Sequence, residues 1–208
     1  MRPKISPYEK VTIIGENGSG KSTLALGYVK NMPSAIIHDP KHEVQLPNFH
    51  ITENPRDLLR FARVIWRSPG DMDPVDAGNI LGEAVLTRKW TCLSLNEAAL
   101  VAPGQRMGPK LRQAIITGRS LKIGVWAETQ RPVDVHNLFF SEAHAYFASP
   151  NLIKSDAQKV VGFVRGYDEF SSQTWPKFTW LFYRKGEGTA QILKLGRAER
   201  PKRRRDSR

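Results

Sequence analysis

The sequence has a single cysteine, Cys92, in 208 residues. One cysteine leaves no partner for an intramolecular disulfide, which favours a reducing, intracellular setting. No apolar run comes near the roughly 18 residues that a membrane span needs, and residues 1–7 lack the apolar core of a secretory signal. No fixed-period repeat is present either. We therefore expect a soluble intracellular protein without a transmembrane segment of its own, and its length suits one α/β domain.

Acidic residues are scarce relative to basic ones: 20 Asp and Glu stand against 32 Lys and Arg, for a net charge of +12. So large an excess indicates an acidic partner such as nucleic acid. Half of it lies between residues 194 and 208, where eight Lys or Arg face two acids. We expect residues 1–195 to form one domain and residues 196–208 a basic, disordered tail. The tail either contacts phosphate groups or only keeps the chain soluble.

The most informative segment covers residues 15–23 and fits the phosphate-binding pattern G-x-x-x-x-G-K-[ST]. A β-branched run over residues 10–14 precedes it and predicts a buried strand, and residues 22–32 have helical spacing. Strand, glycine-rich loop and helix are the context that this pattern requires. The alternative is a glycine-rich turn without a ligand. The residues expected to hold the phosphates are Gly15, Asn17, Gly18, Ser19, Gly20, Lys21, Ser22 and Thr23.

The residue types in this loop explain how it would bind a nucleotide. Glycines let successive backbone N–H groups turn towards an anion, and the start of the helix adds partial positive charge. Lys21 is expected to reach the β- and γ-phosphates, and the Ser22 hydroxyl to bind Mg²⁺. The sequence therefore predicts ATP and Mg²⁺ as the ligands.

A second functional pair follows the apolar run at residues 91–95, which predicts another buried strand. It ends in Asn96 and Glu97, as in a Walker B element, where the first position supports Mg²⁺ and the following acid polarises the attacking water. Asn96 can hydrogen-bond a metal-bound water but brings no negative charge. Glu97 is the candidate general base. The alternative is that both residues only cap the next helix.

Further strands are expected over residues 34–40, 49–52, 63–67, 123–127 and 143–148. Helices are expected over 55–62, 110–121, 134–141 and 152–163, and another begins at Asp73 as its N-cap. Gln130 follows a strand end, where it could contact the γ-phosphate or orient the water. Asp39 either serves the site or caps its loop. Residues 174–183 and 189–195 predict a β-hairpin whose aromatic residues pack rather than stack on bases. Alternating strands and helices indicate a mostly parallel sheet flanked by helices.

These segments together resemble the HerA/FtsK superfamily of DNA-pumping ATPases. The resemblance rests on GENGSGKS (15–22), IHDPK (37–41), LSLNEA (93–98), GRSLKIG (118–124) and TQRP (129–132). It implies a three-layer P-loop NTPase fold of the RecA-like, additional-strand (ASCE) type. It also implies a ring, commonly hexameric, that threads double-stranded DNA. Arg119 would then be an arginine finger reaching a neighbour's γ-phosphate, and Asn96 departs from the usual Asp-Glu pair. The alternative for Arg119 is a cation at a helix end.

The motor core takes most of the chain, which resembles the genome-packaging ATPases of membrane-containing icosahedral viruses. The expectation is a motor that pumps double-stranded DNA into a preformed capsid, with capsid-vertex or membrane proteins as partners, acting at the virion's packaging vertex and in the host cytoplasm. Three alternatives stay open. They are a cellular or plasmid DNA-transfer motor, a small-molecule P-loop kinase, and a scaffold that binds ATP without turnover.

Overall fold

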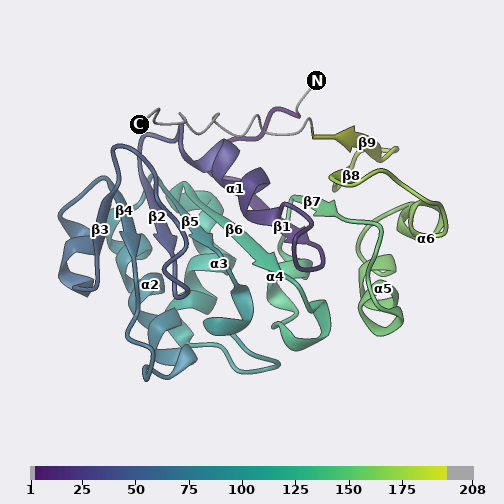
Figure 1. The fold of residues 1–208 in the computed structure, drawn as a ribbon. Coiled ribbons are helices and arrows are strands. Elements are labelled where there is room, and N and C mark those ends of the chain that lie inside the picture. The colour runs from purple at the N-terminus through teal and green to yellow at the C-terminus, as the bar shows by residue number, and fades with distance from the viewer. Residues whose placement is uncertain (1–2, 196–208) are drawn as a thin grey trace, which may run out of the picture.

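The computed structural model describes residues 3–195, so the predicted tail over 196–208 lies outside the described residues. One nine-stranded sheet runs through them, in the order β3-β4-β2-β5-β6-β1-β7-β8-β9 (Figure 1). The strands are β1 (Lys10–Ile14), β2 (Ala35–His38), β3 (His50–Thr52), β4 (Arg63–Trp66), β5 (Thr91–Leu95), β6 (Ile123–Thr129), β7 (Ala145–Ala148), β8 (Thr179–Arg184) and β9 (Gln191–Lys194).

Every pairing among β1 to β7 is parallel, whereas β7 with β8 and β8 with β9 are antiparallel. The predicted mostly parallel sheet with a C-terminal hairpin is therefore confirmed. The strand that precedes the glycine-rich loop, β1, does not pair with β5. Instead β6 lies between them, which is the additional strand that the resemblance implies. The carboxyl ends of β1, β6, β5 and β2 consequently meet at one edge of the sheet.

Helices cover both faces of this sheet, because successive strand residues point to opposite sides. The helices are α1 (Lys21–Val29), α2 (Pro74–Arg88), α3 (Pro109–Leu121), α4 (Leu138–Ser141), α5 (Lys154–Val161) and α6 (Tyr167–Ser171), with 3₁₀ turns at Pro55–Leu59, Ala98–Leu100 and Pro132–Asp134. In β1, Val11 and Ile13 pack against α1, whereas Ile14 faces the opposite cluster. The result is a three-layer arrangement.

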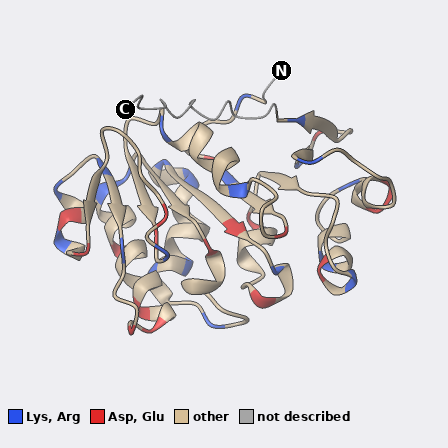
Figure 2. Cartoon of the chain, viewed as in Figure 1, with Lys and Arg blue, Asp and Glu red and all other residues tan. Residues whose placement is uncertain are grey.

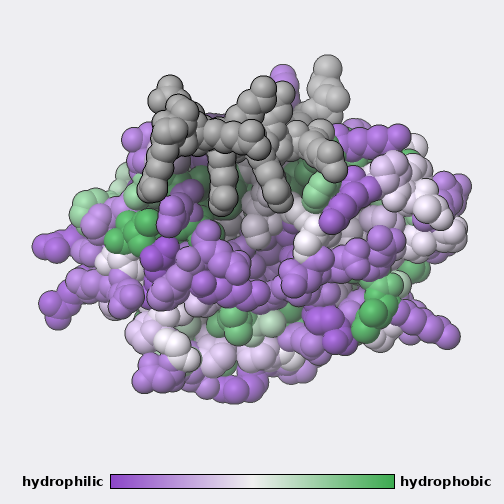
Figure 3. All heavy atoms as spheres, viewed as in Figure 1, coloured by the Kyte–Doolittle hydropathy of each residue, from purple (hydrophilic) through white to green (hydrophobic). Residues whose placement is uncertain are grey.

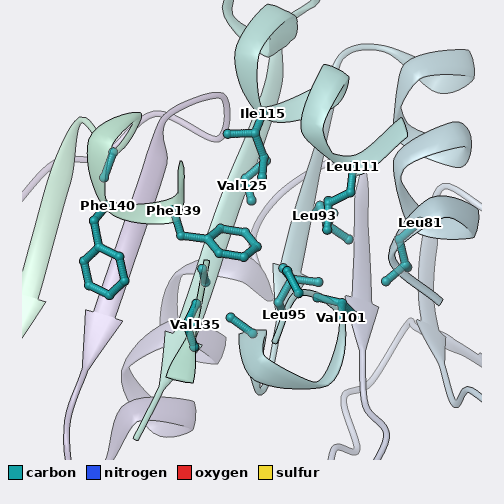
Figure 4. Close-up of a cluster of buried hydrophobic side chains, with 14 of the residues drawn as sticks. Leu81, Leu93, Leu95, Val101, Leu111, Ile115, Val125, Val135, Phe139 and Phe140 are labelled. Carbon is teal, nitrogen blue, oxygen red and sulfur yellow. The ribbon is translucent and has the colours of Figure 1, made fainter. Parts of the chain in front are cut away.

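The larger of the two cores lies between the sheet and the α2–α3 pair. Asp73 caps α2 by accepting a hydrogen bond from the Val75 N–H, as predicted. The two helices approach closely at Gly82, where a Cβ atom would lie 2.3 Å from the Leu111 backbone nitrogen. Figure 4 shows the side chains that fill this layer, among them Leu81 of α2, Leu111 and Ile115 of α3, Leu93 and Leu95 of β5, and Val125 of β6.

Several predicted boundaries are wrong, and a tertiary contact explains the first of them. The helix expected over 134–141 begins only at Leu138, because Val135 is extended and forms an antiparallel bridge with Pro103. The helix expected over 152–163 spans Lys154–Val161, and α6 was not predicted. The hairpin's first strand begins at Thr179 rather than residue 174.

The surface seen in Figure 3 is mostly hydrophilic, with smaller apolar patches among the polar side chains. The aromatic residues of the hairpin pack as predicted: Trp180 is fully buried, and Trp175 stacks on Phe170. Among residues 3–195, none of the helices has both the length and the apolar character needed to cross a bilayer.

Candidate functional site

Most of the predicted site residues gather at the carboxyl edge of the sheet, where parallel α/β sheets place their ligands. The loop after β1, the residues after β5 and Gln130 after β6 all open into one cleft of about 260 Å³. Its walls also include Lys41 and Glu43, from the loop after β2. The lining residues are Asn17, Gly18, Gly20, Lys21, Ser22, Thr23, Lys41, Glu43, Asn96 and Gln130.

The glycine-rich loop has the backbone that phosphate binding requires. Gly18 and Gly20 have φ values of 74° and 93°, in the left-handed region that side chains disfavour. Gly20 stands directly before α1, so the free N–H groups at that helix start face the cleft. The Lys21 ammonium donates to the carbonyl oxygens of Gly15 and Glu16, at 2.9 and 3.0 Å. The loop thus holds its own cation in place.

Three oxygen-bearing side chains meet at the Ser22 hydroxyl. Its Oγ donates towards Asn96 Oδ1 at 2.8 Å and towards Glu128 Oε2 at 2.9 Å. Glu128 was not predicted as a site residue. The strand was expected to end at Ala127, but β6 continues to Thr129 because Glu128 pairs with Ile13 of β1. Figure 2 shows the end of β6 in red and the start of α1 in blue.

Burial makes Glu128 an unusual carboxyl group. Only 1% of its surface is exposed, and this burial raises its pKa to about 8, although the Ser22 hydroxyl and the Lys21 charge oppose the shift. Burial lowers the pKa of the Lys21 ammonium, and the two nearby acids, Glu97 and Glu128, partly offset this shift. One buried ammonium beside the cleft therefore lies close to two buried carboxyl groups.

Glu97, the candidate base, lies beside this cluster without contacting Ser22 in the described hydrogen bonds. Burial raises its pKa above the usual range, whereas Lys41 and Lys21 favour its charged form. The nearby backbone N–H groups of Ala99 and Gln130 favour the charged form as well. A partly desolvated carboxyl group with a raised pKa is suited to accept a proton from water.

The segment that carries Gln130 is anchored from α5. Arg131 Nε lies 2.8 Å from Asp156 Oδ2, and the Val133 N–H donates to Asp156 Oδ1 at 3.1 Å. The Lys159 ammonium donates to the carbonyl oxygens of Pro132 and Val135. Asp156 itself is 1% exposed. These contacts fix the backbone directly after Gln130 and hold that side chain at the cleft.

Of the two roles considered for Asp39, the contacts support the one in which it caps its loop. Its buried carboxylate accepts the backbone N–H groups of Glu43 and Val44, both at 3.0 Å, and lies 3.4 Å from Arg67 Nε. Asp39 therefore shapes the turn that carries Lys41 into the cleft. A role for Lys41 was not predicted, and its charge now faces Glu97 and Glu128.

A second hollow of about 170 Å³ lies on the other side of the glycine-rich loop, between residues 16–19, residues 149–151 and residues 176–179. Within the described chain, the buried hydroxyls of Ser19 and Ser149 have no hydrogen-bond partner. They flank Gly15, where a Cβ atom would lie 2.6 and 2.9 Å from them. Gly15 and Ser19 therefore line this side of the loop, next to polar groups that a bound ligand could satisfy.

Arg119 does not lie in the cleft that Lys21 and Ser22 line. It is exposed in the last turn of α3, which leads into the start of β6 at the amino edge of the sheet. Gln130 follows the opposite end of that seven-residue strand, which spans roughly 20 Å. Arg119 can therefore act on a nucleotide only if it reaches the site of another subunit.

No protein-family model matches the chain, and no curated protein matches its sequence. Its fold is that of P-loop ATPases, and solved structures resemble it over most of its length. The genome packaging NTPase B204 from Sulfolobus turreted icosahedral virus 2 is 20% identical, with a TM-score of 0.77 covering 91% of this chain and 99% of that one.

The DNA-packaging ATPase B204 from Sulfolobus Turreted Icosahedral Virus is 18% identical, with a TM-score of 0.71 covering 92% of this chain and 100% of that one. The conjugation coupling protein TcpA of pCW3 is 14% identical, with a TM-score of 0.56 over 92% of this chain and 62% of that one. These likenesses confirm the resemblance to viral packaging ATPases and FtsK-type ATPases at the level of the fold.

Proposed function

We propose that this chain hydrolyses ATP to move double-stranded DNA, and that it packages a viral genome into a preformed capsid. The observation that carries the proposal is the convergence of Lys21, Ser22 and Gln130 on one cleft, with Glu97 close to Lys21. The likeness to B204 supports the packaging role, because it extends over 99% of that chain. We further propose that residues 1–195 act as a single ATPase domain.

Each residue has a distinct role in this proposal. Loop N–H groups between Gly15 and Thr23 hold the phosphates, and Lys21 neutralises charge on the β- and γ-phosphates. Glu97 accepts a proton from the attacking water, and Gln130 orients that water or contacts the γ-phosphate. The Glu97 carboxyl group lies close enough to the backbone N–H of Gln130 for that group to favour its charged form.

The donor set of the cleft fits a magnesium ion. Mg²⁺ prefers oxygen ligands, and the hydroxyl of Ser22, the amide oxygen of Asn96 and the carboxylate of Glu128 lie together. These residues would hold Mg²⁺ when it binds with ATP, and the ion would supply positive charge against the phosphates. Ser22 and Asn96 are the residues that the sequence predicts for it.

The proposed partners follow from charge and from the packaging analogy. A net charge of +12 suits contacts with the DNA phosphate backbone, which need no sequence-specific reading. We propose a ring of identical subunits, of hexameric type, that docks on capsid-vertex or membrane proteins of the virion and works in the host cytoplasm. The basic residues after position 194 would add phosphate contacts.

Steady-state ATP hydrolysis, measured with and without double-stranded DNA, tests this function. We expect DNA to stimulate hydrolysis, and the stimulation to fade between low and moderate salt because phosphate contacts release counterions. The Lys21→Ala variant, which we expect to be inactive, gives the background rate of ATP hydrolysis. If DNA did not change the hydrolysis rate at low salt and the protein transferred phosphate to a nucleoside, the motor proposal would be wrong. The protein would then be a small-molecule kinase.

Arg119 gives a prediction about the ring. We expect Arg119→Ala to lower the ATP hydrolysis rate of the assembled protein by about 10³-fold or more, the effect known for arginine fingers. Nucleotide affinity should stay unchanged, because Arg119 lies at the opposite edge of the sheet from its own cleft. The measurement is hydrolysis together with binding of a fluorescent ATP analogue. Arg60→Ala, which removes an arginine whose side chain is 72% exposed, serves as the control.

Mixing two inactive variants then separates a finger from a structural cation. An Arg119→Ala subunit keeps an intact loop, and a Lys21→Ala subunit keeps an intact Arg119. A mixture of the two should therefore regain hydrolysis at the mixed interfaces. A mixture that stays inactive, although both variants assemble, would refute the role of Arg119 between subunits.

A further inference from the structure

A charge is missing at the position where the sequence predicts the metal. Asn96 stands at the carboxyl end of β5 with a neutral side chain, and its Oδ1 accepts a hydrogen bond from Ser22. An amide oxygen is a weaker partner for a divalent cation than a carboxylate, because it brings no negative charge. A site built only from Ser22 and Asn96 would face Mg²⁺ with no protein charge at all.

The neighbouring strand provides a carboxylate at the same point. Glu128 Oε2 lies 2.9 Å from Ser22 Oγ, which is as close as Asn96 Oδ1 on the other side. The hydroxyl has one proton for two acceptors. The oxygen atoms of Ser22, Asn96 and Glu128 thus meet at one point, and a cluster of oxygen ligands of this kind suits a divalent cation.

Ionising the buried Glu128 side chain costs free energy unless a cation lies beside it. It is the acidic residue of β6, 1% exposed, between the parallel strands β1 and β5. A buried carboxyl group ionises readily only beside an opposite charge or a metal, and otherwise it stays protonated. Among residues 3–195, Glu128 has no ion pair within 4.0 Å, and the nearby Lys21 is bound to loop carbonyls.

From this geometry we propose that Glu128 supplies the negative charge of the magnesium site that Asn96 lacks. The acid of a Walker B pair is in effect moved from the end of β5 to the end of β6, and both positions reach the Ser22 hydroxyl. The inference rests on the proposed ATP hydrolysis, since the ion would enter with the nucleotide.

The two buried carboxylates then have separate tasks. Glu97 lies near the backbone N–H groups of Ala99 and Gln130 and faces Lys41, whereas Glu128 contacts Ser22, the hydroxyl expected on the metal. Two acids in different environments can serve different steps at one pH. Glu97 is then available to accept a proton from water, because Glu128 supplies the negative charge that the ion requires.

The test measures metal binding rather than turnover. Mn²⁺ replaces Mg²⁺, and electron paramagnetic resonance follows its binding to the protein with AMPPCP. We expect Glu128→Gln to weaken Mn²⁺ binding by about 10- to 100-fold, the range seen even for groups that only support a metal ligand. Glu169→Gln, which neutralises an exposed acid on α6, should leave Mn²⁺ binding unchanged. Unchanged affinity in a folded Glu128→Gln protein would overturn the proposal.

A charge relocation supplies the decisive comparison. In the double variant Asn96→Asp with Glu128→Gln, the carboxylate returns to β5, and we expect most of the lost Mn²⁺ affinity to be regained. A double variant that folds without regaining affinity shows that Glu128 acts by shape rather than charge, which also overturns the proposal. Asn96→Asp alone keeps Glu128 in place. It should raise Mn²⁺ affinity, and no change there counts equally against the inference.

Nucleotide binding without metal keeps this proposal separate from the proposed function. In EDTA, a fluorescent ATP analogue should bind the wild type and Glu128→Gln alike, because the loop and Lys21 are untouched. Loss of binding in the wild type would refute the nucleotide site itself. Equal binding in EDTA, with Mn²⁺ affinity lost only in Glu128→Gln, supports both proposals together.

Discussion

Replacing Lys21 by alanine is expected to abolish ATP hydrolysis, with a loss of at least about 10²-fold, because it removes a fixed charge aimed at the reacting phosphates. The Lys21 side chain is 7% exposed and is already held by the carbonyl oxygens of Gly15 and Glu16. A held ammonium needs little reorganisation when ATP binds. Hydrolysis and binding of a fluorescent ATP analogue, measured side by side, check this result.

The control is Lys30→Ala, an exposed lysine at the other end of α1. It should leave hydrolysis unchanged and shows whether any loss of basic charge on this helix matters. Thermal unfolding must accompany both variants, because Lys21 is the ammonium that faces Glu97 and Glu128. A folded Lys21→Ala protein with normal turnover would refute the assignment of the loop.

The strand and loop that carry Lys21 could be predicted from the sequence because their local pattern and their tertiary role agree. The strands at Lys10–Ile14 and Thr91–Leu95 have the predicted bounds. Both are buried on each face, since helices cover both sides of a parallel sheet. Gly15 and Asn96, which follow them, mark where each strand leaves the core. The candidate site lies at those transitions, so most of the residues predicted for it stand directly after strands.

Glu128 could not be found in this way, because it breaks the rule that located the others. Acidic and hydroxyl side chains at the end of an apolar run suggest that the strand has already ended before them. Pairing with β1 nevertheless extends β6 through Glu128 and Thr129. Its role depends on Asn96 and Ser22, which are far away in sequence and come together only when β5, β6 and β1 lie side by side. The same holds for Val135, which is kept extended by Pro103.

Replacing Glu97 by glutamine is expected to lower kcat by about 10²- to 10⁴-fold, the contribution of a general base, while nucleotide and Mn²⁺ binding persist. Glutamine keeps the shape and one acceptor oxygen for the backbone at Ala99 and Gln130, but it cannot take a proton from water. Single-turnover hydrolysis and Mn²⁺ binding with AMPPCP, on the same protein, check both halves of this expectation.

The comparison with Glu128→Gln makes this prediction specific, because both variants replace a buried carboxyl group near Lys21 with an amide of the same shape. If Glu97 is the base and Glu128 the metal carboxylate, Glu97→Gln loses turnover with Mn²⁺ affinity intact, whereas Glu128→Gln loses Mn²⁺ affinity first. Normal turnover in Glu97→Gln would remove Glu97 from the chemistry. Loss of Mn²⁺ binding in Glu97→Gln with retention in Glu128→Gln would reverse the two roles. Burial and contacts, rather than charge alone, are what distinguish these acids.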